Sequence, residues 1–358
     1  MKLRNLPRFS FPAPLVDLIS ANLQRAGFSY ERPETLAQAI LALSDLYNSK
    51  GGSDQVWTRA SHRAAYWGYF LPLNFLRLQA VVEEGQRLGF FTDLDHLVDF
   101  GSGPGTGHLV WELTENLSPL QKLISIEASS LARDQHQTWT NSLKTRHPFR
   151  LIEGRDLPPP PTDRSLALLS YSLNELGVLP SQLYSYSHIL IVEPSTREAG
   201  RKLMTLRQEL IDKGFSIWAP CPHQQQCPLL SQSKQDWCHD RILIERPTWM
   251  VTLEQSLPLD NRSLTFSYLM ACRQSPGGEG GLARVIGDTR KEKGKTRQAV
   301  CRGPKREFLA WLKKEGQPPI IPRGALVRLP SDSPSKGNEV RPQGNVDLVS
   351  CHRQNEMA

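Results

Sequence analysis

The first part of the chain places apolar residues three and four positions apart, with polar residues opposite them. ETLAQAILALSDLYN (34–48) and RLQAVVEEGQRL (77–88) both follow this pattern, which is typical of amphipathic helices. Between them lies the aromatic-rich stretch SHRAAYWGYFLPLNF, interrupted by Pro72 and typical of packing between helices. We predict an N-terminal helical region over residues 1–90.

From about residue 94 the apolar positions gather in short runs of β-forming residues, separated by helical stretches. The runs are DHLVDF, KLISIEAS, SLALLSYS, HILIVEPS, GFSIWAP and, after a cysteine-rich insertion, LTFSYLMACR. Strands that alternate with helices predict a parallel, doubly wound sheet. We therefore expect an α/β domain over residues 91–275, with the insertion at residues 221–262.

The chain beyond residue 275 is basic and rich in glycine. It suggests a short helix at REFLAWLKK and a strand at GALVRL, within an extension over residues 276–330. This extension looks too small and too charged to build its own core, so a bound metal would have to anchor it. The polar sequence SDSPSKGNEVRPQGN predicts a disordered tail over residues 331–358.

Composition limits the class of protein. Hydrophobic residues make up 39% and charged residues 22% of the chain, as in ordinary globular proteins. The longest apolar runs are too short to cross a bilayer, and the N-terminus lacks the apolar core and cleavage site of a secretory signal. We expect no membrane partner and a compartment that keeps thiols reduced, where clustered cysteines favour metal over disulfides.

Positive charge is concentrated in one segment. The chain carries a net charge of +7, and residues 284–306 hold nine Lys or Arg against only Asp288 and Glu292. A local basic patch is the footprint expected of a protein that binds a phosphate backbone. A solvated, flexible loop would have the same composition, so charge alone leaves both interpretations open.

A glycine loop follows the first run of the α/β domain, in HLVDFGSGPGTGHLVWEL. Asp99 ends the strand, and Gly101, Gly103, Gly105 and Gly107 follow at alternate positions, unlike the G-x-G-x-x-G spacing of dinucleotide sites. The motif resembles that of S-adenosylmethionine-dependent methyltransferases, which implies a Rossmann-like sheet whose loop wraps the methionine part of the cofactor. The resemblance also implies that Glu127 receives the ribose hydroxyls, and it places Asp156 near the adenine.

Methyl transfer itself has weaker support. Asn174 and Glu175, in SYSLNEL after the fourth strand, are candidates to face the methyl group. No base-binding motif is present, and no cysteine is available there as a nucleophile. Catalysis therefore stays open.

The insertion gathers thiols in CPHQQQCPLLSQSKQDWCH. Cys221, Cys227 and Cys238 lack the C-x2-C spacing of common zinc folds. Zinc and an iron–sulfur cluster both suit four thiolates. The candidates for a fourth ligand are His223, His239, Cys272, Cys301 and Cys351; of these, Cys272 suits a buried strand and Cys351 a free tail.

The cysteine segment, the glycine loop, IEAS, LNEL and IVEPSTREA together resemble the Rsm-type methyltransferase-like family of the mitochondrial and bacterial small ribosomal subunit, over residues 55–310. The resemblance implies a [4Fe–4S] cluster on Cys221, Cys227, Cys238 and Cys301. The sequence departs from the family near Cys301, where GKT replaces the usual Gly-His-Val, so His239 is the alternative fourth ligand. His223 and His239 otherwise fit positions around the ligands.

The resemblance implies work on the small ribosomal subunit, in assembly or translation, bound to its RNA. We expect a protein that is monomeric when free, cytoplasmic in a bacterium and in the mitochondrial matrix of a eukaryote. An active S-adenosylmethionine-dependent RNA methyltransferase with a purely structural zinc or iron–sulfur site is the alternative, and a redox or iron sensor is a third possibility. The metal would hold a basic segment against folded RNA, through Arg290, Lys291, Lys293, Lys295 and Arg297.

Overall fold

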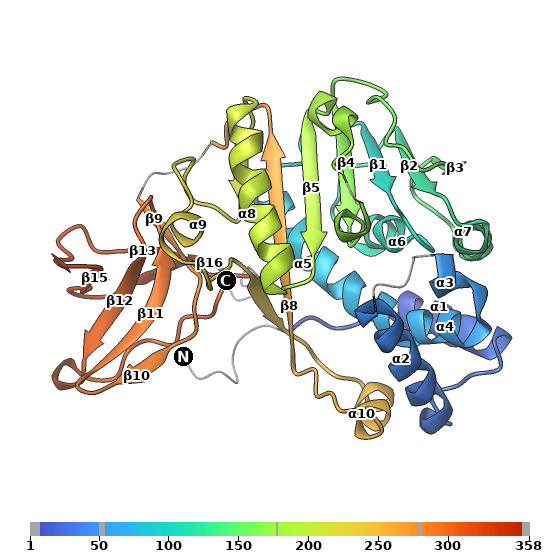
Figure 1. The fold of residues 1–358 in the computed structure, drawn as a ribbon, viewed down its shortest axis with the longest axis horizontal. Coiled ribbons are helices and arrows are strands. Elements are labelled where there is room, and N and C mark those ends of the chain that lie inside the picture. The colour runs from blue at the N-terminus through green and yellow to red at the C-terminus, as the bar shows by residue number, and fades with distance from the viewer. Residues whose placement is uncertain (1–7, 50–53, 177, 278–280, 353–358) are drawn as a thin grey trace.

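A computed structural model describes residues 8–49, 54–176, 178–277 and 281–352 (Figure 1). Its N-terminal part is helical, as the apolar spacing predicts. A proline stands in the first turn of three of these helices, where its missing N–H is not needed, and Gly89 ends the last one at a φ of 73°. The helices are α1 (Ala13–Arg25), α2 (Pro33–Asn48), α3 (Asp54–Thr58), α4 (Ala60–Ala65) and α5 (Leu71–Leu88), with a π-helical turn at Tyr66–Phe70.

A Rossmann-like sheet follows, with the strand order β3-β2-β1-β4-β5-β8-β6. The strands β1 to β5 are mutually parallel, whereas β8 runs antiparallel to both β5 and β6. This arrangement confirms the predicted α/β fold class. The strands are β1 (His96–Phe100), β2 (Lys122–Glu127), β3 (Phe149–Glu153), β4 (Ser165–Ser170), β5 (His188–Glu193), β6 (Ser216–Ala219) and β8 (Ser263–Cys272).

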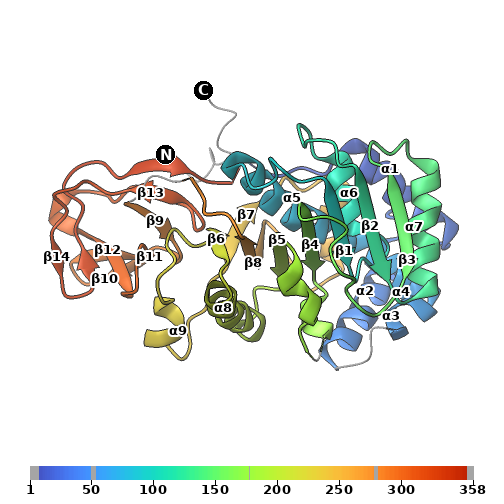
Figure 2. The same ribbon diagram turned by 90° about the horizontal axis from the view of Figure 1, so that it is seen from above.

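Helices cover both faces of this sheet, with α5 and α6 (Thr106–Leu113) on one face and α8 (Arg197–Asp212) on the other (Figure 2). Neighbouring residues of a strand therefore enter different cores: Leu97 packs with the N-terminal helices, and Val98 with the α8 side. Burial on both faces explains why the strands read as continuous apolar runs. Helix α7 (Ser130–Ser142) packs into the same core as α5 and α6.

The cysteine-rich insertion leaves the sheet after β6 and returns as β8. It contains α9 (Pro228–Gln232), β7 (Asp240–Leu243) and α10 (Thr248–Gln255). Strand β7 pairs antiparallel with the first residues of β8, so the insertion is continuous with the sheet's edge.

The C-terminal region forms a second eight-stranded sheet, at the opposite end of the molecule from α7 (Figures 1 and 2). Its path is β14-β15-β12-β11-β9-β13-β16, with β10 paired to β11. The strands are β9 (Leu282–Val285), β10 (Arg290–Glu292), β11 (Lys295–Cys301), β12 (Glu307–Leu312), β13 (Leu326–Arg328), β14 (Ser335–Lys336), β15 (Glu339–Val340) and β16 (Asp347–Ser350).

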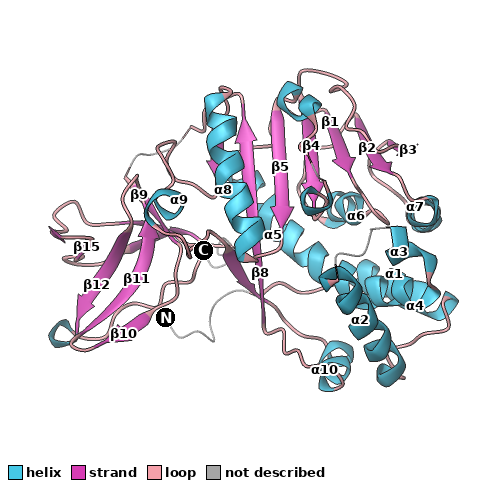
Figure 3. Ribbon diagram, in the orientation of Figure 1, coloured by secondary structure: helices cyan, strands magenta, loops and turns pink. Residues whose placement is uncertain are grey.

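This second sheet differs from three expectations. Most of REFLAWLKK forms strand β12 rather than a helix, because β11 and β15 flank it and take up its backbone hydrogen bonds (Figure 3). Its last two residues, Lys313 and Lys314, begin a short 3-10 helix. Residues 331–352 include three short strands of the sheet instead of a disordered tail, and residues 353–358 lie outside the described part. The extension also has an apolar core of its own, which includes Val285, Leu309 and Val340.

Among the described residues, the structure contains no helix long and apolar enough to cross a membrane.

Candidate metal centre and cofactor site

The structure brings four of the six cysteines to the junction of the two sheets. Cys221 lies just beyond β6, Cys227 precedes the first residue of α9, and Cys238 lies two residues before β7. Cys301 comes from the other sheet, where it ends β11. The insertion and the C-terminal sheet thus contribute to one cluster of thiols, although the two segments are far apart in sequence.

These thiols influence one another electrostatically. Burial raises the pKa of Cys238 well above its usual value, and negative charge on Cys221, on Cys227 or on Cys301 raises it further. Burial likewise raises the pKa of Cys301, with further contributions from Cys221 and Cys227. Negative charge on the neighbouring thiols therefore opposes ionisation of Cys238 and of Cys301.

The spacing of the sulfurs bears on which metal would fit. Among the described residues, no three of these sulfurs lie within 4.8 Å of one another. A single zinc ion with Zn–S bonds of about 2.3 Å would draw its thiolates closer together than that. A four-iron cluster is a larger body and holds its thiolates further apart.

The two histidines of the insertion lie around the thiols. His223 Nε2 is 3.2 Å from Cys301 Sγ, a hydrogen-bonding distance. The His239 ring stacks on Trp237, and burial beside Arg323 lowers the pKa of His239 to about 4. These contacts suit residues that orient ligands, as the sequence suggests, and the choice between Cys301 and His239 as fourth ligand stays a prediction.

The two other cysteines lie outside this cluster. Cys272 is buried in β8, within the core shared with the N-terminal helices, which matches a core thiol. Cys351 packs against the core of the second sheet, so it is not a free tail residue.

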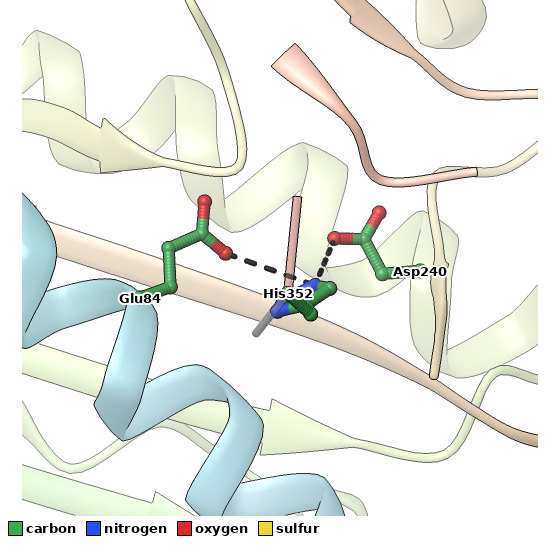
Figure 4. Close-up of side chains that lie close together, drawn as sticks. All are labelled: Glu84, Asp240 and His352. Carbon is green, nitrogen blue, oxygen red and sulfur yellow. Dashed lines mark hydrogen bonds and ion pairs between the residues drawn. The ribbon is translucent and has the colours of Figure 1, made fainter. Parts of the chain in front are cut away.

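A buried ionic network, which the sequence analysis missed, joins the sheets beside the thiols. Glu84 of α5, Asp240 of β7 and His352 place their potential ligand atoms within 4.8 Å of one another (Figure 4). Arg284 of β9 supplies the cation: it donates to Glu84 Oε1 at 2.8 Å and also to Asp240. His352 Nε2 is 3.1 Å from Asp240 Oδ2. The chain itself therefore neutralises these carboxylates.

The glycine loop lies against the two acids that the sequence predicts for the cofactor. Asp99 is buried at the end of β1 with Oδ2 lacking a hydrogen-bond partner, and burial, with a smaller contribution from Glu127, raises the pKa of Asp99 to about 7. The Glu127 carboxylate accepts hydrogen bonds at 2.8 Å from the backbone N–H of Gly103 and of Ser129. The loop and the second acid are thus held together.

Neighbouring helices support this loop from two sides. Trp139 Nε1 of α7 donates to the Pro104 carbonyl at 2.8 Å. Gly105, at a φ of 91°, lies so close to His136 that a Cβ there would be 2.4 Å from the imidazole Nε2. Trp57, from the N-terminal helices, approaches Gly103. The loop therefore needs glycine for both its backbone conformation and its packing.

Asn174 and Glu175 are exposed on a short 3-10 helix (Leu173–Glu175) that follows β4. Beside them lies Glu193, at the end of β5, which the sequence analysis did not single out. Burial raises the pKa of Glu193 to about 8, and its Oε1 accepts a hydrogen bond from the Leu173 N–H at 2.9 Å. A buried acid at the end of a strand is a candidate for a functional site. In the sequence, however, HILIVEP reads only as an apolar run, so Glu193 does not stand out.

The remaining predicted residues differ in their surroundings. Asp156 is exposed in the loop that follows β3. Arg290, Lys291 and Lys293 are exposed on the β10–β11 hairpin and form no ion pair with any described residue. In contrast, Lys295 and Arg297 pair with Glu292 and Glu339, and Arg297 lies 4.0 Å above the ring of Phe308.

Comparison with known proteins gives one family. The model of the family described as mitochondrial small ribosomal subunit Rsm22 matches residues 60–317. Comparison with curated proteins gives no match.

The solved structures that match this chain are distant in sequence. A SAM-dependent methyltransferase from Aquifex aeolicus is 11% identical, with 54% of this chain and 90% of that chain covered and a TM-score of 0.31. TYW2 from M. jannaschii, in complex with AdoMet, is 12% identical, with 55% and 77% covered and a TM-score of 0.28.

Proposed function

The chain belongs to the mitochondrial small ribosomal subunit Rsm22 family, and from that premise we propose that it is an RNA-binding assembly factor whose C-terminal sheet is held in place by an iron–sulfur cluster. The methyltransferase-like sheet and the link to the small ribosomal subunit follow from the fold and the family. The RNA, the cluster and a bound S-adenosylmethionine are parts of the proposal. In a eukaryote its place would be the mitochondrial matrix, and in a bacterium the cytoplasm.

One observation carries the proposal: thiols from the insertion and from the second sheet meet at the junction from which the basic hairpin extends. Cys301 is the last residue of β11, and the first residue of this strand, Lys295, follows Lys293 by two positions. A metal held by Cys301 and the insertion would therefore fix the direction in which β11 and its cations extend. The spread of the sulfurs favours an iron–sulfur cluster over a single zinc ion.

The hairpin supplies the charge for RNA. Arg290, Lys291 and Lys293 are exposed and free of ion pairs with the described residues, so phosphates can approach them without displacing a carboxylate. Lys295 and Arg297 would have to exchange Glu292 or Glu339 for phosphate, and we assign them a smaller contribution. Such contacts position a protein on RNA without reading its sequence.

The thiol cluster is tested by Cys221→Ser and Cys227→Ser, with Cys272→Ser as the control because Cys272 is buried away from the cluster. We expect the first two variants to lose iron and sulfide, together with at least tenfold of their affinity for small-subunit RNA. The control should keep both. RNA affinity that persists after the metal is gone would refute the role of the cluster in binding.

The hairpin is tested by replacing Arg290, Lys291 and Lys293 with Gln together. Each phosphate contact contributes about 0.7 to the slope of log affinity against log salt for single strands, so the slope should flatten by about 2. Lys213, which follows α8 and lies 4.4 Å above the ring of Tyr184, gives the control variant Lys213→Gln. An unchanged slope in the triple variant would exclude the hairpin as the RNA contact.

The second candidate function is an active RNA methyltransferase with a purely structural metal. Buried polar atoms without partners, Asp99 Oδ2, Ser102 Oγ and Thr106 Oγ1, line the glycine loop and fit a polar ligand. S-adenosylmethionine would supply the methyl group there, held by Asp99, Glu127 and the backbone of the loop. Beside Leu173 lies a groove of about 830 Å³ with room for an acceptor.

Tritium transfer from S-adenosylmethionine to ribosomal RNA separates the two functions, with Asp99→Ala as control. Transfer that this variant abolishes would establish the enzyme. Binding of the cofactor without transfer would favour the assembly factor.

A further inference from the structure

Arg207 of α8 is a buried cation with no acidic partner among the residues that the structure describes. Its side chain is 2% exposed. Nε donates to Cys221 Sγ at 3.1 Å, one terminal nitrogen donates to the His223 carbonyl at 2.7 Å, and the other terminal nitrogen has no partner. Within the described part of the chain, no carboxylate lies within ion-pair distance of the guanidinium.

A second deeply buried arginine, Arg284, has the counter-charge that Arg207 lacks. Arg284 is also 2% exposed, and it contacts two carboxylates, those of Glu84 and Asp240. Burying a guanidinium without a counter-charge is strongly unfavourable, which is why buried cations in folded proteins are paired. Arg207 therefore needs an anion, and among the described residues the one side chain to which it donates a hydrogen bond is that of Cys221.

Protonated thiols cannot provide that anion, because they are neutral. Four thiolates around a zinc ion or a [4Fe–4S] core contribute more negative charge than the metal contributes positive charge, so a loaded centre is an anion. The missing counter-charge of Arg207 appears when the thiols are ionised and metal is bound.

We propose that Arg207 is the built-in counter-ion of the metal centre, placed by α8 to hold the Cys221 thiolate and to slow the loss of metal. This inference rests on the proposed thiol-bound metal and adds a residue outside the ligand set. Arg207 also fixes the backbone of the insertion at His223, whose ring reaches Cys301. One guanidinium thereby connects the first ligand of the insertion with the ligand from the second sheet. It is a positioning residue.

A cation beside the sulfur also has an electronic effect if the metal is iron. Hydrogen bonds to the sulfurs and nearby positive charge stabilise the reduced, more negative form of a cluster. Removing the guanidinium should therefore lower the reduction potential, whereas a residue that only filled space would leave the potential unchanged.

The test uses the full chain with Arg207→Met and Arg207→Lys. Arg201→Met is the matched control: Arg201 belongs to the same helix and also anchors the insertion, by donating to the Ser233 and Asp236 carbonyls at 3.0 Å, and neither of its hydrogen bonds is to sulfur. The first readout is the rate at which a chelator removes metal from purified protein, which applies to zinc and iron alike. The second is the midpoint potential by spectroelectrochemistry, which applies to an iron cluster.

We expect Arg207→Met to release metal at least tenfold faster than the wild type, and Arg207→Lys, which keeps the charge, to recover part of the difference. For an iron cluster, a tenfold lower equilibrium constant for uptake of one electron corresponds to a midpoint potential about 59 mV lower. Arg201→Met should match the wild type in both readouts.

Equal release rates in the wild type and Arg207→Met would overturn the counter-ion role while leaving the proposed metal centre intact. A wild type that binds neither iron nor zinc would refute the metal centre itself, and the counter-ion role with it. If Arg201→Met changed the rate as much as Arg207→Met, anchoring of the insertion would be the cause, and the electrostatic role would be refuted.

Discussion

Replacing Arg284 with Met should destabilise the junction between the second sheet and the rest of the molecule. The guanidinium is 2% exposed and contacts Glu84 of the N-terminal helices, Asp240 of the insertion and the Tyr268 hydroxyl of β8. Met fills much of the same space but removes the shared counter-charge of two buried carboxylates, and leaves Arg87 3.6 Å from Glu84 Oε1 and the His352 ring 3.1 Å from Asp240 Oδ2. Breaking a buried pair by removing one partner costs about 3–5 kcal/mol.

The pH dependence has a definite sign. Arg284 lies beside Glu84 and Asp240, and the pKa values of both carboxyls are lowered despite burial. A lowered pKa in the folded state gives stability that is present above the unfolded value, near pH 4, and is lost as the pH falls through the folded value. The free energies of unfolding of the wild type and Arg284→Met should therefore differ at pH 7 and converge in acid.

Urea unfolding at pH 7, together with hydrogen exchange of β9 to β16, measures the effect. Exchange in these strands should accelerate more than exchange in β1 to β5, because Arg284, Glu84 and Asp240 join the sheets and belong to neither apolar core. Arg241→Met is the control: its pair with Asp288 is 36% and 52% exposed, and exposed pairs contribute at most about 1 kcal/mol. A loss below about 1 kcal/mol in Arg284→Met would refute the reasoning.

Two further predictions concern the glycine loop. Burial is the main cause that raises the pKa of Asp99 to about 7, so its contribution to stability is fully present below about pH 4 and declines as the pH rises to about 7. Asp99→Asn should abolish this decline; melting temperatures of the two proteins that change equally from pH 4 to 8 would contradict the prediction. Gly105→Ala should cost about 1–3 kcal/mol for its backbone conformation and more for the contact with His136, whereas Gly281→Ala, at a φ of 85° in open space, should show the backbone cost alone. Equal losses of stability in chemical denaturation would show that the contact with His136 adds no cost.

The first sheet could be predicted because its signals are local. Apolar runs such as HILIVEP are buried on both faces, and Gly103 and its neighbours mark the turn at the end of β1 in the chain's own order. The second sheet could not be predicted in the same way. Its strands are short and carry many charges, and EFLAWL becomes a strand through its neighbours in space.

The candidate cofactor and metal residues also fall into two groups, those that the sequence indicates and those that only burial reveals. Asp99 and Glu127 follow apolar runs beside a glycine loop, and three cysteines cluster within residues 221–239, so the sequence singled them out. Glu193 and Arg207 did not stand out, because an acid after an apolar run or an arginine on a helix is commonplace until its burial is known.

Local sequence alone determined the order of helices and strands in the first sheet, the glycine turn, the set of thiols and the position of the basic segment. Each of these features depends on residues that are neighbours in the chain. Tertiary structure alone decided that the C-terminal segment builds its own sheet and core. It also decided that Cys301 reaches the insertion, and that Arg284 is neutralised by carboxylates whereas Arg207 is not. The physical reason is that burial and charge balance depend on residues far apart in the chain, which only the folded backbone brings together.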